Sequence, residues 1–464
     1  MRGVSNFNPC LLYFITLIFY CFADALKGVH LNNSKYFLIF GDILILFVSL
    51  SVAFNKSNSI SFDKNLSLIK KVPSPLIWFF IFYVFYILIR TLFPSYSEPV
   101  LAIGGVRTHL LGFFLVPFGV YLSRDEKGEL FYKITIFLLG VILLIFVGQL
   151  IQVLSIGKDI PVISDLLYRI VAKHSFHYNG DHFPVLLKNS FFNSNKRLGH
   201  IIIFSYLFLL YSNSVGARKN YLRTPIYLVA TAICILSIFF SGSREAMVVL
   251  LFVFFFYFIF FRQMIVSTLL MSITLFSLIA ILFFIFVDTS NFGSLIFDLK
   301  HRISFLVSEP EDYLDKFRWM VLSPFNSASK ILGGESLFFG RGLGAFGQEV
   351  MLDSFYRDLS QNHIFNLSTI RGDSGAMKLI VEVGFFGTFL FFLLYLYVIF
   401  RYSVLPLMVV TLDSSDKNLL SLYMIPIVWM VFFLKAFPVH SDMLNAMFMF
   451  PVIGFLIGKR PEVN

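Results

Sequence analysis

Residues 131–154 read FYKITIFLLGVILLIFVGQLIQVL, and Lys133 is their only charged side chain. A helix needs about 20 consecutive apolar residues to cross the hydrocarbon core of a bilayer, and this run is long enough. Much of the chain has the same character, because 58% of the 464 residues are hydrophobic and 14% are charged. Soluble domains are nearer half apolar and about a quarter charged. This excess of apolar side chains requires lipid as a solvent. The sequence therefore predicts an integral membrane protein.

The predicted architecture is an all-α bundle of about 12 transmembrane helices, forming one polytopic membrane domain over residues 1–464. The apolar runs of suitable length are 8–25, 36–54, 75–93, 100–122, 131–154, 198–213, 225–241, 245–261, 264–287, 376–400, 419–437 and 443–458. The run 100–122 is the least regular, because it contains Arg107 and His109.

Basic residues between the runs predict the orientation. The net charge is +10, and it falls mainly in short connections, which favours membrane orientation and anionic lipid or phosphate over nucleic acid. If the N-terminus is cytoplasmic, the inner connections hold the main groups of basic residues, such as Lys56, Lys64, Lys70 and Lys71, whereas the outer connections 94–99 and 438–442 contain no Lys or Arg. We therefore expect both termini on the cytoplasmic side of the membrane.

Two long hydrophilic segments, about 155–197 and 288–375, fall on the extracytoplasmic side of this topology. Long segments escape the positive-inside rule, so their basic residues do not oppose the placement. Residues 165–171 and 313–322 show helical amphipathic spacing, which predicts helices lying along the membrane surface.

Charged residues at the outer ends of four spans are the candidate binding groups. Arg107 lies in the fourth span, Arg197 precedes His200 at the mouth of the sixth, and Arg244 occupies the turn before the eighth. Glu382 lies near the start of the tenth. Charge within a span is costly and usually functional. Each also has a structural alternative: headgroup contact for Arg107 and Arg197, pairing with Glu245 for Arg244, and helix packing for Glu382.

The late outer segment supplies further candidates. Arg318 precedes Trp319, Arg341 lies within a glycine-rich stretch, and His363 and Asp373 follow before the tenth span. A loop histidine is often merely exposed, so the position of His363 alone does not assign it a role. The glycine-rich stretch is not a Walker loop, because no Gly-Lys-Ser/Thr follows. Its glycines favour tight backbone turns beside a ligand.

Several arginines and one histidine outside the membrane suit a phosphate-linked donor. The guanidinium fork matches phosphate oxygens and neutralises charge on a leaving pyrophosphate. A histidine near neutral pKa can deprotonate an acceptor hydroxyl. The outer segments contain no Asp-x-Asp pair or metal-ligand cluster, so this chemistry requires neither metal nor cofactor.

The second half of the chain resembles the O-antigen polymerase and O-antigen ligase superfamily. The matching pieces, in order, are Ser243-Arg244, Arg318-Trp319, residues 339–344 (FGRGLG), His363 and residues 382–387 (EVGFFG). Each motif is short, and their order together with the topology carries the resemblance. The first half matches in general layout only.

The resemblance implies a metal-independent, inverting-type membrane glycosyltransferase with a GT-C-like fold, acting on undecaprenyl-pyrophosphate-linked oligosaccharide in lipopolysaccharide biosynthesis. It implies that Arg244 and Arg318 bind the pyrophosphate and that His363 activates the acceptor hydroxyl. Arg107, Arg197, His200, Arg341, Asp373 and Glu382 are the further substrate-binding candidates. The expected partners are the lipid-linked oligosaccharide, membrane lipid and a chain-length regulator, with no nucleic acid. The resemblance also implies that the chain lies in the inner (plasma) membrane of a bacterium.

Two activities compete within this superfamily. A Wzy-type polymerase transfers a growing glycan to a new lipid-linked repeat unit, whereas a WaaL-type ligase transfers it to lipid A-core. The two large outer segments and the Arg169-to-Gly180 spacing favour the polymerase. Ile364 after His363 departs from the ligase pattern, which places Asn, Ser or Gln there.

A lipid-linked oligosaccharide flippase is the alternative from a different class. Flippases place charges in a central cavity, and transporters often contain repeated halves, which this sequence does not show. A non-catalytic membrane scaffold is a third reading, for which the outer polar residues have no use.

Overall fold

The computed structural model describes residues 8–28, 34–54, 74–92, 105–107, 109–124, 129–154, 177–178, 181–182, 195–216, 224–241, 243–260, 335–340, 342–343, 375–409, 419–435 and 443–459. Within these ranges the chain is almost entirely helical, which confirms the predicted all-α class. The one exception among regular elements described is a two-residue antiparallel pair, β1 (His177–Tyr178) and β2 (Asp181–His182).

The helices follow the predicted apolar runs closely. They are α1 (Pro9–Gly28), α2 (Ser34–Phe54), α4 (Ser74–Leu92), the 3-10 helix η2 (Leu111–Leu115), α6 (Val116–Ser123), α7 (Glu129–Leu154), α9 (Asn195–Gly216), α10 (Thr224–Ser241), α11 (Arg244–Phe260), α15 (Glu335–Phe339), α17 (Gly375–Ile399), the π-helix η4 (Phe400–Val404), α18 (Leu405–Val409), α19 (Leu420–Lys435) and α20 (Met443–Lys459). The predicted run 264–287 lies outside the described residues.

Three described stretches are long and apolar enough to cross a membrane by themselves: Pro75–Leu92, Phe131–Leu150 and Lys378–Met408. The other apolar helices have shorter qualifying stretches of 10–17 residues. The run 100–122 differs from the single continuous helix that we predicted, because residues 111–115 form a 3-10 helix before α6 begins.

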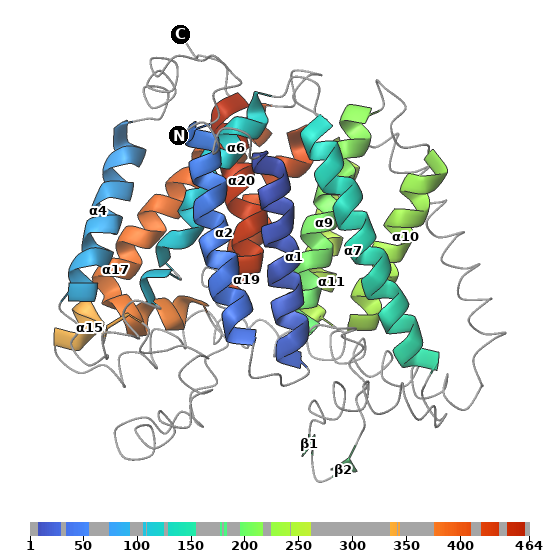
Figure 1. Ribbon diagram of the computed structural model, residues 1–464, viewed down its shortest axis with the longest axis horizontal. Coiled ribbons are helices and arrows are strands. Elements are labelled where there is room, and N and C mark those ends of the chain that lie inside the picture. Colours follow the sequence, from blue (N-terminus) through green and yellow to red (C-terminus); the bar gives the residue numbers. More distant parts are fainter. Residues whose placement is uncertain are drawn as a thin grey trace.

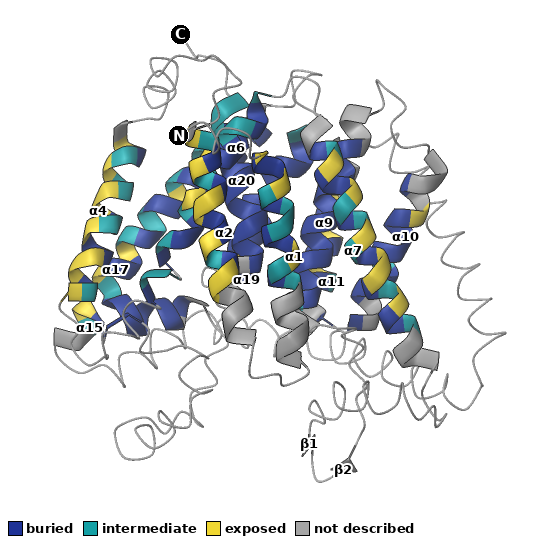
Figure 2. Ribbon diagram, viewed as in Figure 1, coloured by how far each residue is buried: buried dark blue, intermediate teal, exposed yellow. Residues whose placement is uncertain are grey.

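The helices stand side by side as a bundle (Figure 1). The start of α1 and the end of α20 lie at one end of the bundle, whereas α15 and the start of α17 lie at the other, which we call the α15 end (Figure 1). The outer surface is apolar: Phe85, Leu144 and Leu251 are all more than 60% exposed. Exposed side chains stripe α4 and α7 in Figure 2, so these surfaces suit lipid rather than water.

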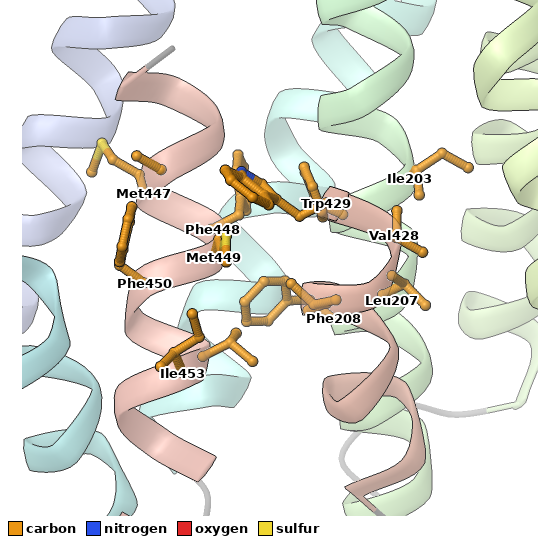
Figure 3. Close-up of a cluster of buried hydrophobic side chains, with 14 of the residues drawn as sticks. Ile203, Leu207, Phe208, Val428, Trp429, Met447, Phe448, Met449, Phe450 and Ile453 are labelled. Carbon is orange, nitrogen blue, oxygen red and sulfur yellow. The ribbon is translucent and has the colours of Figure 1, made fainter. Parts of the chain in front are cut away.

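The centre of the bundle is built on α19 and α20. Figure 3 shows Trp429 of α19, Phe448 of α20 and Phe208 of α9 meeting in one apolar cluster. Trp429 also stacks between Tyr395 of α17, at 5.0 Å between ring centroids, and Phe433, at 5.6 Å. The abundant aromatic residues therefore fill the interior as well as covering the lipid-facing surface.

The closest helix contact joins α6 to α20. A Cβ atom on Gly119 would overlap the carbonyl oxygen of Pro451, and one on Gly454 would overlap that of Val116. Small residues that let two backbones approach are a recurrent means of helix association in membranes, where apolar burial from water gives little drive.

The topology can be tested with single cysteines. In a background with Cys10, Cys21 and Cys234 replaced by Ala, we expect Asn195→Cys, at the start of α9, to react with an impermeant maleimide on intact cells. Lys459→Cys, at the end of α20, should react only after permeabilisation. Labelling of Lys459→Cys in intact cells would contradict the cytoplasmic C-terminus.

The α6–α20 contact predicts a stability effect. Gly119→Ala should lower the free energy of unfolding by about 1–3 kcal/mol, because the new methyl group meets backbone that cannot rotate away. The matched control is Gly140→Ala, since a Cβ there has nothing within 4 Å. Thermal unfolding in detergent measures both variants. Equal unfolding midpoints for Gly119→Ala and Gly140→Ala would contradict a close α6–α20 contact at Gly119.

Candidate functional site

A break in α17 organises the α15 end of the bundle. Gly384 has φ +69° and ψ −176°, which interrupts the helix after Val383. Any other residue would be strained there, and a Cβ would also overlap the carbonyl oxygen of Phe338. The residues after α15 lie against this break: Gly340, with φ +74°, would place a Cβ 2.5 Å from the Glu382 carbonyl oxygen.

A backbone hydrogen bond joins the two segments. The Gly342 amide donates to the carbonyl oxygen of Glu382 at 3.2 Å. Gly340 and Gly342 of the FGRGLG motif (339–344) are therefore in direct contact with residues 382–384, the first half of the EVGFFG motif. We call this contact of residues 338–340 and 342 with residues 382–384 the glycine joint.

Helix α4 supplies side chains that close the glycine joint. The Tyr86 hydroxyl lies 2.6 Å from the Val383 carbonyl oxygen and 3.4 Å from that of Phe339. The Arg90 guanidinium donates from Nη2 to the Gly340 carbonyl oxygen at 3.1 Å. A helix break in lipid leaves backbone groups that need partners inside the protein, and these two side chains provide them.

Next to the joint lies a buried cluster of ionisable groups, the Glu382 cluster. His109 Nε2 lies 2.9 Å from Glu382 Oε2, and both side chains are fully buried. Lys378 Nζ lies 3.8 Å from Glu382 Oε1, one helical turn earlier in α17. On the other side of the imidazole, the Tyr83 hydroxyl lies 2.9 Å from His109 Nδ1.

The chemistry of the groups constrains the directions of these contacts. A carboxylate only accepts hydrogen bonds and a protonated imidazole nitrogen donates, so the contact between His109 and Glu382 suits a proton on Nε2. The Tyr83 hydroxyl can donate to Nδ1 or accept from it, depending on the imidazole tautomer. The ammonium group of Lys378 and the Glu382 carboxylate form an ion pair, which offsets part of the cost of burying either charge.

A second polar group, the His200 cluster, forms where α9 meets α11. His200 Nε2 lies 3.9 Å from Glu245 Oε2, and Asn445 Nδ2 lies 3.5 Å from His200 Nδ1. The imidazole stacks on Phe432 of α19, with ring centroids 3.8 Å apart. The site thus draws on α9, α11, α19 and α20.

The turn before α11 positions Arg244 beside this cluster. Ser243 Oγ accepts from the Ala246 amide at 3.4 Å and so caps the N-terminus of α11, in which Arg244 is the first residue. Gly199 packs on this turn, since a Cβ there would lie 2.7 Å from Ser243 Oγ. Ser243 and the first residues of α11 therefore form a capped helix start against the first turns of α9.

Aromatic rings connect the two clusters through α19 and α17. Phe432 stacks on His200, and the adjacent Phe433 packs on Phe391 of α17 with ring centroids 5.2 Å apart. The Phe391 ring lies 5.9 Å from that of Tyr83, which belongs to the Glu382 cluster.

Arg107 is engaged elsewhere. It forms an ion pair with Asp42, which also accepts a hydrogen bond from the Tyr20 hydroxyl. The Arg107 side chain is 22% exposed. This contact ties the segment before η2 to the hairpin of α1 and α2, a structural role that the headgroup alternative did not anticipate.

The structure places some of the predicted site residues and leaves others undescribed. Glu382 and His200 lie in the two clusters, Arg197 is a partly exposed residue in the first turn of α9, and Arg244 begins α11. Arg341 falls between Gly340 and Gly342, but it lies outside the described residues, as do Arg318, His363 and Asp373. The proposed catalytic trio therefore stays a prediction.

Sequence reasoning missed five residues at the glycine joint and in the Glu382 cluster: Tyr83, Tyr86, Arg90, His109 and Lys378. Arg90 had a usable signal, because it is an arginine near the end of the apolar run 75–93. Lys378 stands four residues before Glu382, the spacing of an intrahelical ion pair. Tyr83 and His109 can be recognised as site residues only in the folded structure, where α4 and the segment before η2 are in contact.

Among the residues that the structure describes, no group of three or more His, Cys, Asp or Glu side chains is arranged to hold a metal ion. Comparison with protein-family models, curated proteins and solved structures finds no match to this chain.

The His109–Glu382 contact predicts energetic coupling. Removing one partner leaves the other buried and uncompensated, so Glu382→Leu and His109→Leu should each cost about 3 kcal/mol of stability. The double variant should cost less than the sum by at least about 1 kcal/mol. Thermal unfolding in detergent of all four proteins measures this difference.

The comparison cycle pairs Glu382→Leu with His200→Leu, whose contacts lie in the other cluster. Those two effects should add within about 0.5 kcal/mol. Equal coupling in both cycles would argue against a specific His109–Glu382 interaction.

Proposed function

We propose that this protein is a membrane glycosyltransferase that polymerises lipid-linked oligosaccharide, acting as an O-antigen polymerase. The glycine joint is the observation that carries the proposal. It brings the FGRGLG motif (339–344) onto the EVG motif (382–384), two pieces of the superfamily pattern that lie about 40 residues apart in sequence. Contact between them is what a shared role at one site requires.

The placement of Arg244 adds support. Its helix begins against the first turns of α9, close to His200. Aromatic rings of α19 and α17 connect His200 to Tyr83 in the Glu382 cluster, so the Ser243-Arg244 motif starts a helix packed in the same bundle as the glycine joint. The finer architecture belongs to the same proposal: about 12 spans in a GT-C-like arrangement, with both termini cytoplasmic.

In the proposed reaction, the acceptor hydroxyl attacks the anomeric carbon of the donor sugar. His363 takes the hydroxyl proton as the new glycosidic bond forms. The bond from the anomeric carbon to the pyrophosphate oxygen breaks, and polyprenyl pyrophosphate leaves with the bonding electrons. Arg244 and Arg318 neutralise the charge that develops on it, which is the largest demand of a transfer without metal.

Two alternatives make different products. An O-antigen ligase would use the same donor but transfer it once, to lipid A-core. A flippase would move lipid-linked oligosaccharide across the membrane without changing it, and the buried Glu382 cluster would then serve coupling or gating. The Glu382 cluster is packed between α4 and α17 rather than spread along a central path, which favours the enzyme.

Turnover by the purified protein tests the proposal. With undecaprenyl-pyrophosphate oligosaccharide and EDTA present, we expect a ladder of longer lipid-linked products. Arg244→Ala and His363→Ala should each reduce the rate by at least about 100-fold, the scale expected for losing charge stabilisation or general-base catalysis.

Arg401→Ala is the matched control, because Arg401 lies in η4, beyond the far end of α17 from the glycine joint, and should retain the wild-type rate. A single transfer to lipid A-core would identify a ligase. Unchanged oligosaccharide that crosses proteoliposome membranes would identify a flippase, and loss of the ladder on adding EDTA would refute metal independence.

A further inference from the structure

Helix α4 has two faces of different character. Trp78, Phe82 and Phe85 are each more than half exposed and cover the lipid-facing side. Tyr83, Tyr86 and Arg90 lie on the opposite side, and each is at least 93% buried. Their spacing of three and four residues places them along one helical stripe.

The hydrogen bonds of this stripe reach the glycine joint and the adjacent Glu382 cluster. Tyr83 contacts His109 at 2.9 Å, and His109 contacts Glu382. Tyr86 reaches carbonyl oxygens on both sides of the joint, those of Val383 and Phe339. Arg90 reaches the Gly340 carbonyl oxygen at 3.1 Å, directly before Arg341.

The glycine joint needs these contacts because it is small. Among the described residues of the joint, one backbone hydrogen bond, from the Gly342 amide to the Glu382 carbonyl oxygen, joins the two segments directly. The glycines allow close approach, but they contribute no side chain to hold it. A charged donor makes a stronger hydrogen bond than a neutral one, and Arg90 supplies such a donor.

We propose that the α4 stripe of Tyr83, Tyr86 and Arg90 is a latch that holds Gly340 and Gly342, the residues on either side of Arg341, against the break in α17. Arg90 is its principal residue and acts through Gly340, so it is a positioning residue rather than a catalytic one. The joint fixes the backbone on both sides of Arg341, and the latch determines how long that backbone stays in place. The effect on transfer rests on the proposed function, whereas the latch itself does not.

The latch places a specific demand on Arg90. Its donor must reach a backbone carbonyl from a helix whose other face is in lipid, and it lies near the outer end of that helix. Lysine keeps the charge and one donor, so Arg90→Lys retains part of the contact. Glutamine loses the charge, so Arg90→Gln weakens the latch with a smaller change of shape than alanine.

Hydrogen exchange measured by mass spectrometry tests the latch without any substrate. In the full chain in lipid nanodiscs, peptides covering residues 335–343 should exchange at least about tenfold faster in Arg90→Gln than in wild type. Tyr86→Phe should give a smaller increase, and Arg90→Lys should fall between wild type and Arg90→Gln. Arg401→Gln is the control and should leave these peptides unchanged.

The same variants are then assayed for transfer from undecaprenyl-pyrophosphate oligosaccharide. Arg90→Gln should raise the KM for the donor more than it lowers kcat, with partial rescue in Arg90→Lys, because a loosened Arg341 segment binds the donor less often. Unchanged exchange over 335–343 in both Arg90→Gln and Tyr86→Phe would overturn the latch. Faster exchange with unaltered kinetics would overturn its positioning role.

A wild-type protein that makes no glycosyl transfer would refute the proposed function, and the exchange result would still decide the latch. General unfolding of Arg90→Gln is distinguished by peptides from α7, which lies away from the joint and should keep wild-type exchange. If α7 is also exposed in that variant, Tyr86→Phe decides between the outcomes.

Discussion

A helix that breaks inside a membrane has to find partners for the backbone groups that the break releases, and this constraint organises the α15 end of the bundle. The break at Gly384 turns the carbonyl groups of Glu382 and Val383 toward other elements. The amide of Gly342 and the hydroxyl of Tyr86 meet them, because lipid provides no water to do so. The conformation of one glycine therefore requires a segment about 40 residues away in sequence and a helix from the first quarter of the chain.

The buried Glu382 cluster follows from the same arrangement. Glu382 is the last residue but one before the break, so its side chain remains on the regular part of α17, one turn from Lys378. Its main-chain carbonyl accepts from the Gly342 amide while its carboxylate faces His109. One residue thus joins a backbone contact to a charge contact. Balancing a lysine against a carboxylate keeps this group tolerable where either charge alone is expensive.

The apolar runs, the helical class and the membrane setting were predictable, because each depends on length and local composition alone. The positions of helices such as α7 and α20 agree with their predicted runs within a few residues. Residues 100–122 were harder, since the 3-10 helix at Leu111–Leu115 depends on packing against α2 and α20. Glu382 was identified as a buried or functional residue by its charge within a span. Its partner His109 was not, because nothing in either local sequence indicates that the segment before η2 packs on α17.

Arg90 shows that a site in a membrane protein is found more readily by asking which side chains satisfy exposed backbone carbonyl groups than by looking for charges alone. As a charge near the end of an apolar helix, it is equally compatible with reaching the headgroups. Its guanidinium instead donates to the carbonyl oxygen of Gly340. Gly340 has a positive φ and lies against Gly384, which also has a positive φ. In a regular helix, backbone carbonyl groups accept hydrogen bonds from amides of the same helix. Where two glycines with positive φ interrupt the chain, the nearby carbonyl groups need hydrogen-bond donors from other elements. An arginine and a tyrosine four residues apart on one helix are well suited to supply them, and here they fix the segment that carries Arg341.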